Sequence, residues 1–217
     1  QSSGLVDQFY IQPAAGDAGG AVGSALALWH QFNEQSASSQ SAYLGPKFSE
    51  KEIEKCLNRN GAKWHLLSDS DLFDQTANAI ANGEVVGWYQ GRMEFGPRAL
   101  GNRSIIGDPR NEEMQKKLNL KIKYRESFRP FAPSVLEEDA AQFFNLNVPS
   151  PYMLLVAPVK EERREAVPAD YASLPMKEKL YTKRSDLQAI THVDFSARVQ
   201  TVSREQNERY YQLLQAM

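Results

Sequence analysis

The residues best suited to chemistry lie together between Gly91 and Pro133, in the segment GRMEFGPRALGNRSIIGDPRNEEMQKKLNLKIKYRESFRPFAP. Between Arg92 and Arg129 this segment holds ten Lys or Arg and five Asp or Glu, so its net charge is ten minus five, about +5. The whole chain carries a net charge of −2. A local cationic patch on a mildly acidic protein indicates a small anionic ligand rather than a general affinity for polyanions.

Glycines and prolines shape the backbone around these cations. Gly96 and Gly101 permit positive φ or a close approach to a ligand, and Pro97 stiffens the turn before Arg98. Guanidinium forks match phosphate and carboxylate oxygens, and Lys adds a mobile point charge. The cations near Gly or Pro are Arg98, Arg103, Lys123 and Arg129. Asn102 and Ser104 lie beside them and could add neutral donors. The alternative is that these cations pair with the acidic residues of the same segment on a solvated surface.

A row of polar residues at period two follows in HVDFSARVQ, residues 192–200. On a strand, alternate side chains share one face. The residues of that face would be His192, Asp194, Ser196, Arg198 and Gln200. The pattern alone leaves open whether this face lines a site or meets solvent.

The segment AAGDAGG, residues 14–20, resembles the Gly-rich loops that precede a helix in nucleotide sites. Backbone amides and the helix dipole could hold a phosphate there. The segment has no Gly-Lys-Ser/Thr and does not match the dinucleotide fingerprint, so an ordinary turn is the alternative. One Cys and the scattered His30, His65 and His192 fit no metal-ligand spacing, and no catalytic triad emerges.

The predicted elements mix helices and strands, which indicates an α/β or α+β domain. Helices are predicted over about 21–32, 49–58, 71–81, from 108, over 134–144 and after 203, and strands over 84–90, 152–159, 189–193 and 198–202. If the chain is extended at Lys121, Lys123 and Arg125, these three cations share one face. Residues 160–179 are charged and interrupted by Pro, which favours a solvated excursion.

The composition fits a globular protein of a reducing compartment. Apolar residues make up 41% of the chain, and the single cysteine, Cys56, suits the cytoplasm. No apolar run reaches the roughly 20 residues that span a bilayer, and no signal peptide is visible at the start. A pI near 6.0 disfavours broad binding to nucleic acid.

Three segments resemble the O-carbamoyltransferase family, which includes nodulation-factor and antibiotic-tailoring carbamoyltransferases. They are EFGPRALGNRSIIGDPR, KYRESFRPFAPSVL and HVDFSARVQTV, and they occur in the order of the family's C-terminal region. YLGPKFS, residues 43–49, resembles the family's link between domains. PAAGDAGGAVGSAL, residues 13–26, resembles the closing segment of a preceding actin-like ATPase-type domain.

The resemblance implies three parts. Residues 1–42 would be the helical tail of the actin-like N-terminal domain, and residues 43–68 a linker with a helix. Residues 69–217 would form a YrdC-like domain, a twisted mixed sheet with flanking helices, incomplete at its C-terminus. The family's His-based metal site is expected in the N-terminal domain, outside this chain.

The resemblance also implies a reaction. ATP, with Mg²⁺, would activate carbamoyl phosphate to carbamoyl-adenylate, and the N-terminal domain would pass the carbamoyl group to a substrate hydroxyl. The predicted catalytic residues are Arg98, Lys123 and Arg129. The predicted substrate-binding residues are Arg103, Ser104, His192, Ser196 and Arg198. The predicted nucleotide-binding residues are Gly16, Asp17, Gly19 and Gly20.

Two other functions compete with this hypothesis. YrdC-like domains resemble binders of double-stranded RNA, although a net charge of −2 and the lack of a basic aromatic platform argue against RNA. The chain could also be a catalytically silent fragment that docks on its N-terminal domain. Measured binding of carbamoyl phosphate, ATP and RNA separates the three hypotheses.

Overall fold

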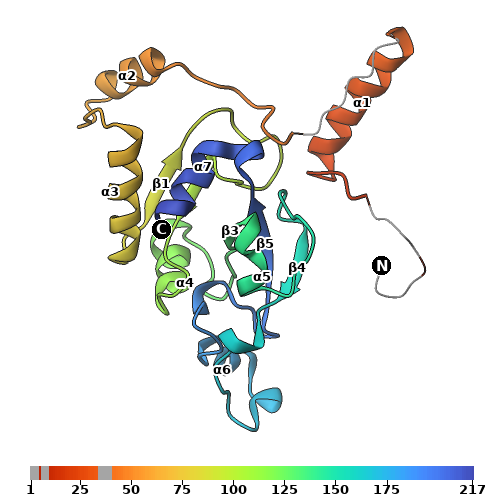
Figure 1. Ribbon diagram of the computed structural model, residues 1–217, viewed down its shortest axis with the longest axis vertical. Helices are drawn as coiled ribbons and strands as arrows, with labels where there is room; N and C mark the ends of the chain where they lie inside the picture. Colours follow the sequence, from red (N-terminus) through yellow and green to blue (C-terminus); the bar gives the residue numbers. More distant parts are fainter. Residues whose placement is uncertain (1–4, 6–9, 34–40) are drawn as a thin grey trace.

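The computed structural model describes residues 5, 10–33 and 41–217 (Figure 1). Helix α1 covers Asp17–Phe32 and begins about four residues before its predicted start. It has no buried residue, and it lies apart from the rest of the described chain in Figure 1. Most of the polar linker predicted after this helix falls in residues 34–40, outside the described residues.

The next two helices begin at the serines that cap them. Helix α2 covers Glu50–Arg59, and its predicted capping box is confirmed, because the Ser49 amide donates to the Glu52 carboxylate at 2.7 Å while Ser49 Oγ accepts from the Glu52 amide at 3.4 Å. Helix α3 covers Asp69–Ala81, two residues earlier than predicted, since Ser68 caps it.

Within the described ranges, five strands form two small sheets. Strand β1 (Val86–Tyr89) pairs antiparallel with β2 (Arg103–Ile106), with Val86 opposite Ile106. The second sheet has the order β3-β5-β4, in which β5 runs parallel to β3 and antiparallel to β4. Its strands are β3 (Ser134–Leu136), β4 (Leu155–Pro158) and β5 (Ser196–Val202). This mixture of helices and mixed sheets confirms the predicted α+β class.

Helix α7 (Arg204–Ala216) joins the two sheets. It contacts α3 as well as β3 and β5, and α3 contacts β1. Figure 1 shows α3 and α7 flanking β1. The shared core contains Phe73, Ile80, Trp88, Ile106, Val202, Tyr210, Tyr211 and Leu213. Burial of this apolar surface from two helices and two sheets is what fixes the sheets relative to each other.

Short helical turns make up the remaining elements. They are α4 (Met114–Lys117), the π-helix η1 (Leu118–Ile122), η2 (Glu137–Asp139), α5 (Ala140–Phe143), η3 (Glu161–Arg163), η4 (Tyr171–Ser173), α6 (Met176–Tyr181) and η5 (Gln188–Ile190). No helix among the residues described is long and apolar enough to cross a membrane.

Two predicted helix starts are wrong. Asp108 does not begin a helix, because its carboxylate accepts from the Arg110 amide at 2.9 Å and closes a turn, and α4 begins only at Met114. Ser134 begins strand β3, whose register places Ser134 opposite Gln200. Here long-range strand pairing overrides the local capping preference, and helical structure starts only at Glu137.

The predicted strand over 189–193 is wrong, and the extended conformation considered for residues 121–125 is not formed. Lys121 belongs to the π-helix η1, and Lys123 follows it, so these cations do not alternate along a strand. Residues 188–190 form the 3₁₀ turn η5 because the chain must bend before β5. The excursion over 160–179 is mostly exposed, as predicted, except that Tyr171 is buried and donates to the Val193 carbonyl at 2.9 Å.

Candidate functional site

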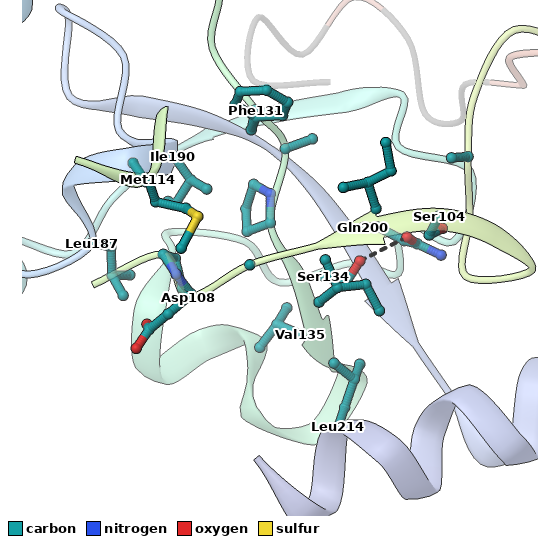
Figure 2. Close-up of a pocket in the computed structure, with 18 of the residues that line it drawn as sticks. Ser104, Asp108, Met114, Phe131, Ser134, Val135, Leu187, Ile190, Gln200 and Leu214 are labelled. Atoms are coloured by element: carbon teal, nitrogen blue, oxygen red, sulfur yellow. Dashed lines mark hydrogen bonds between the residues drawn. The ribbon is translucent and has the colours of Figure 1, made fainter. Parts of the chain in front are cut away.

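A cavity of about 620 Å³ opens where β2, β3 and β5 face the short helix α4 and the end of α7. Its floor is apolar and includes Ile106, Met114, Phe131, Val135, Leu187, Ile190 and Leu214. In Figure 2 the labelled apolar side chains of Met114, Leu187 and Ile190 lie at one end of the pocket, and the polar Ser104 and Gln200 lie at the other. The cavity therefore suits a ligand with an apolar body and a polar end.

Five cationic residues line this cavity, and two of them already have partners. Arg110 makes a bidentate ion pair with Asp108, with both nitrogen–oxygen distances at 2.9 Å. Arg125 donates from Nε to Asn119 Oδ1 at 2.7 Å and lies over the Phe131 ring. The remaining three are Arg98, Lys123 and Arg198. Within the described ranges, no protein group forms a hydrogen bond or an ion pair with these three side chains.

Arg98 and Arg198 are close enough to influence each other electrostatically. Burial lowers the pKa of Arg198 first, and the positive charge of Arg98 lowers it further. These two cations repel each other and have no carboxylate partner among the described residues. An anion bound between them would lower the electrostatic free energy of the pair. The geometry therefore favours an anionic group at this end of the cavity.

The loop that carries Arg98 is tied to a buried hydrogen-bond network. The Tyr43 hydroxyl donates to the Leu100 carbonyl at 2.9 Å, and burial raises the pKa of Tyr43 to about 12, so the phenol keeps this proton. Asn207 Nδ2 donates to Asn102 Oδ1 at 2.8 Å, and Gln90 Nε2 donates to the same oxygen at 2.9 Å. The network thus links the loop to Tyr43 in the segment before α2, to Gln90 after β1, and to α7.

A strained backbone brings Lys123 to the cavity. Tyr124 adopts a positive φ of 49°, which is uncommon for a non-Gly residue. Lys123 and Arg125 both line the cavity, while the side chain between them, Tyr124, is 85% exposed. The π-helix and this turn therefore bring Lys123 and Arg125 to the cavity, whereas Lys121 is not among its lining residues.

Strand β5 supplies Arg198 and Gln200 from the predicted polar row. Gln200 accepts from Ser134 Oγ at 2.9 Å (Figure 2). It also donates to the Leu100 carbonyl at 3.0 Å, which ties the strand to the Arg98 loop. Because they are two positions apart on a strand, the two side chains lie on one face. The polar row is therefore divided, and only its second half reaches the cavity.

The first half of the row forms a separate cluster. Ser196 Oγ donates to Asp194 Oδ1 at 2.6 Å and lies 3.1 Å from His192 Nδ1. Burial lowers the pKa of His192, which keeps the ring neutral near pH 7. The serine lies between the other two groups rather than beside an activating base alone, so the arrangement is not that of a nucleophile triad. None of the three residues lines the cavity.

The cavity thus brings four predicted site residues together and leaves the others outside. Those together are Arg98, Ser104, Lys123 and Arg198. Arg103 instead donates to the Gln90 carbonyl at 2.6 Å and lies over the Tyr89 ring. Arg129 pairs with Glu126 at 2.9 Å on the surface. His192 and Ser196 lie in the separate cluster described above.

The predicted nucleotide-binding glycines stand at the start of α1. Gly16, with φ 134°, precedes the helix, and Asp17 is its first residue. The Gly19 amide donates to the Ala14 carbonyl at 3.0 Å, and the Gly20 amide donates to the Gly16 carbonyl at 2.8 Å. The two amides have internal partners, and these residues do not line the cavity, so their nucleotide role stays a prediction.

The predicted site did not include Arg125, the Asp108–Arg110 pair or the apolar floor. Arg125 continues the Lys121–Lys123 alternation, so that pattern could have identified it. The floor comes from residues as far apart in the sequence as Ile106 and Leu214, and local periodicity assigns them only to a core. No group of three or more potential metal ligands occurs in the part of the chain that the structure describes.

Comparison with known sequences places the chain in a family. Residues 77–217 match the family model described as carbamoyltransferase C-terminus. Because the match covers more than half of the chain, the chain belongs to this family.

Curated relatives agree with this assignment. An uncharacterized protein of Synechocystis is 58% identical, over 97% of this chain and 36% of its own length. Nodulation protein NolO of Bradyrhizobium diazoefficiens is 41% identical, over 99% of this chain and 36% of its own. The 3'-hydroxymethylcephem-O-carbamoyltransferase of Amycolatopsis lactamdurans is 34% identical, over 98% of this chain and 35% of its own. The chain therefore spans about a third of the length of these relatives.

Proposed function

We propose that this chain is the part of an O-carbamoyltransferase that binds carbamoyl phosphate and ATP and forms carbamoyl-adenylate, in a YrdC-like domain over residues 69–217. The observation that carries the proposal is the convergence on one cavity of three cations that have no partner in the described part of the chain. Those cations are Arg98, Lys123 and Arg198. Carbamoyl phosphate and the phosphates of ATP bring several negative charges together, and such a ligand needs several cations.

The chemistry needs positioning and charge stabilisation more than it needs a nucleophile. Transfer at a phosphoryl or acyl-phosphate group spreads negative charge over oxygens, and preorganised cations lower the free energy of that arrangement. Arg98 and Arg198 would hold phosphate oxygens, Lys123 would add a mobile charge, and Ser104 a neutral donor. Mg²⁺ would enter bound to the ATP phosphates, as is usual for this ion.

The apolar floor suits the body of a nucleotide. Side chains such as Ile106, Met114 and Phe131 can contact a planar base while the cations hold its phosphates. Arg129 reaches the same ligand only if it releases Glu126, and an exposed ion pair of that kind is weak enough to exchange.

The acceptor step belongs to a longer protein. The name of the Amycolatopsis relative describes carbamoyl transfer to a hydroxymethyl group. We extend a hydroxyl acceptor to this chain, with its pocket in the actin-like N-terminal domain that the resemblance implies. The names of the nodulation and cephem relatives leave the particular acceptor open.

Calorimetric titration tests the proposal. The 217-residue chain is titrated with freshly prepared carbamoyl phosphate, with MgATP and with a short duplex RNA, and the titrations are repeated with Arg98→Ala and Lys123→Ala. Each variant should bind carbamoyl phosphate about tenfold more weakly, because a charge-assisted contact contributes roughly 1.5 kcal/mol or more.

Lys116→Ala is the matched control, since Lys116 lies on α4 and pairs at the surface with Glu113. Its affinity should equal that of the wild type. The absence of carbamoyl phosphate binding by the wild-type chain would overturn the proposal. RNA binding with a steep salt dependence would favour the competing RNA hypothesis.

A further inference from the structure

The loop that presents Arg98 begins and ends at a single buried carboxylate. Glu94 is 7% exposed and precedes the loop. Its Oε1 accepts three backbone amides from the far end of the loop: Leu100 at 2.6 Å, Asn102 at 2.9 Å and Arg103 at 3.3 Å. The Glu94 side chain therefore holds the two ends of the loop 95–99 together.

The Glu94 charge has no cationic partner. No ion pair to Glu94 occurs among the residues that the structure describes. A buried carboxylate is costly unless hydrogen bonds compensate for its lost hydration, and here backbone N–H groups do so. An apolar residue would avoid that cost but could not hold three amides. The carboxylate is thus suited to fixing this backbone.

Further contacts hold the same two ends. The Phe95 amide donates to the Ala42 carbonyl at 2.7 Å, and the Leu100 carbonyl accepts from both Tyr43 and Gln200. Between these ends lies Arg98, whose side chain has no hydrogen-bond or ion-pair partner among the residues that the structure describes. The loop is therefore rigid where it is anchored and free where it faces the cavity.

Rigid anchoring matters because Arg98 is held near another cation. Without an anion present, repulsion from Arg198 favours any conformation that moves the Arg98 loop away. A fixed loop prevents that movement, so a ligand does not have to order the loop when it binds. The position of Arg98 thus depends on the hydrogen bonds that Glu94 accepts from the far end of the loop.

We propose that Glu94 is a positioning residue of the anion site, which closes the Arg98 loop and holds the guanidinium in its binding position. The inference rests on the proposed function, since it assigns Arg98 to that site. Glu94 itself does not line the cavity and contacts no ligand there.

Two substitutions at one position test the inference. In Glu94→Gln the amide oxygen can still accept the three N–H groups, so carbamoyl phosphate affinity should stay within about threefold of the wild type. In Glu94→Ala the acceptor is lost, and affinity should fall about tenfold or more, as it would for removal of Arg98 itself. Hydrogen exchange at the Leu100 and Asn102 amides should also become faster in the alanine variant only.

Val202→Ala is the matched control for a general loss of stability. Val202 is buried in the shared core and does not line the cavity, so this change should lower Tm and leave affinity unchanged. All affinities are measured at a temperature where each variant is folded.

The outcomes separate the inference from the proposed function. If the wild type binds carbamoyl phosphate and Glu94→Ala binds it equally well, the inference is overturned and the proposed function stands. If Glu94→Ala and Val202→Ala lose affinity alike, Glu94 is merely structural and the inference fails. If the wild type binds no carbamoyl phosphate, the proposed function fails and the inference with it.

Discussion

Cations of two regions of this protein differ in what surrounds them. At the cavity Arg98, Lys123 and Arg198 have no protein partner among the described residues. In the charged segment over residues 160–186, Arg163 pairs with Asp186 at 2.8 Å, and Lys183 pairs with Glu112 at 3.2 Å. Both regions are rich in charge, so the number of cations alone does not distinguish them.

Arg184 shows the contrast most clearly. It is buried to 1% exposure, and its guanidinium donates to the carbonyls of Leu180, Thr182 and Thr191 at 2.9 to 3.0 Å. Burial lowers the pKa of Arg184, as it lowers that of Arg198. Arg184 stabilises a loop through its hydrogen bonds, whereas Arg198 has no partner among the described residues, as the proposed anion site requires. The hydrogen bonds that an arginine makes within the protein, and not its residue type, distinguish a structural arginine from a candidate ligand-binding one.

The largest expected effect is the loss of the buried cation. Arg184→Ala should lower the free energy of unfolding by about 3 kcal/mol, because it empties a buried space and removes the donors for several carbonyls. Chemical denaturation measures this change. Lys183→Ala is the adjacent control: Lys183 makes its ion pairs at an exposed surface, so no measurable change is expected. Equal losses in the two variants would remove the contrast.

At the cavity, the loss of a cation should raise the stability of the protein instead of lowering it. Arg198→Met should raise Tm by roughly 1–3 °C, because it removes a half-buried charge that Arg98 repels, while carbamoyl phosphate affinity falls. Thermal unfolding without ligand measures the first effect and titration the second. Arg163→Met should lower Tm instead, since it leaves Asp186 without its partner. A decrease in Tm for Arg198→Met would contradict the interpretation.

The smallest effect concerns the His192 cluster between the two regions. Because burial lowers the pKa of His192 below 6.5, the unfolded chain binds a proton more readily than the folded one as pH falls through 6.5. Stability should therefore decrease from pH 7.5 to 5.5. The decrease should be smaller in His192→Asn, whose amide can replace Nδ1 beside Ser196. Denaturation at both pH values checks this, and identical slopes for the two proteins would refute it.

Local sequence signals identified the elements whose start is fixed by a single side chain. Ser49 and Glu52 make their capping box wherever that helix lies, because both partners are three residues apart. Ser134 and Glu137 have the same spacing, yet β5 pairs with Ser134 and a strand forms instead. The difference is a partner 66 residues away, which no local pattern contains.

The predicted site residues also fall into two groups, those that line the cavity and those that have partners elsewhere. Residue type and the nearby Gly and Pro were sufficient to select Arg98, Ser104 and Lys123 from their surroundings. They left open whether Arg129 pairs with Glu126, three residues before it, and they did not reveal that Arg103 donates to backbone carbonyls. Those outcomes depend on which acceptors the fold brings within about 3 Å, the range of a hydrogen bond.

The sequence by itself determined the class of the protein, the cationic segment and the chemistry that such a segment can support, because charge, residue type and short-range spacing are properties of the chain. Only the tertiary structure decided which cations remain free. That depends on long-range packing, which places Arg98 close enough to Arg198 of β5 to lower the pKa of Arg198, brings the exposed Lys123 to the edge of the cavity beside a strained Tyr124, and buries Glu94 beneath the loop it closes.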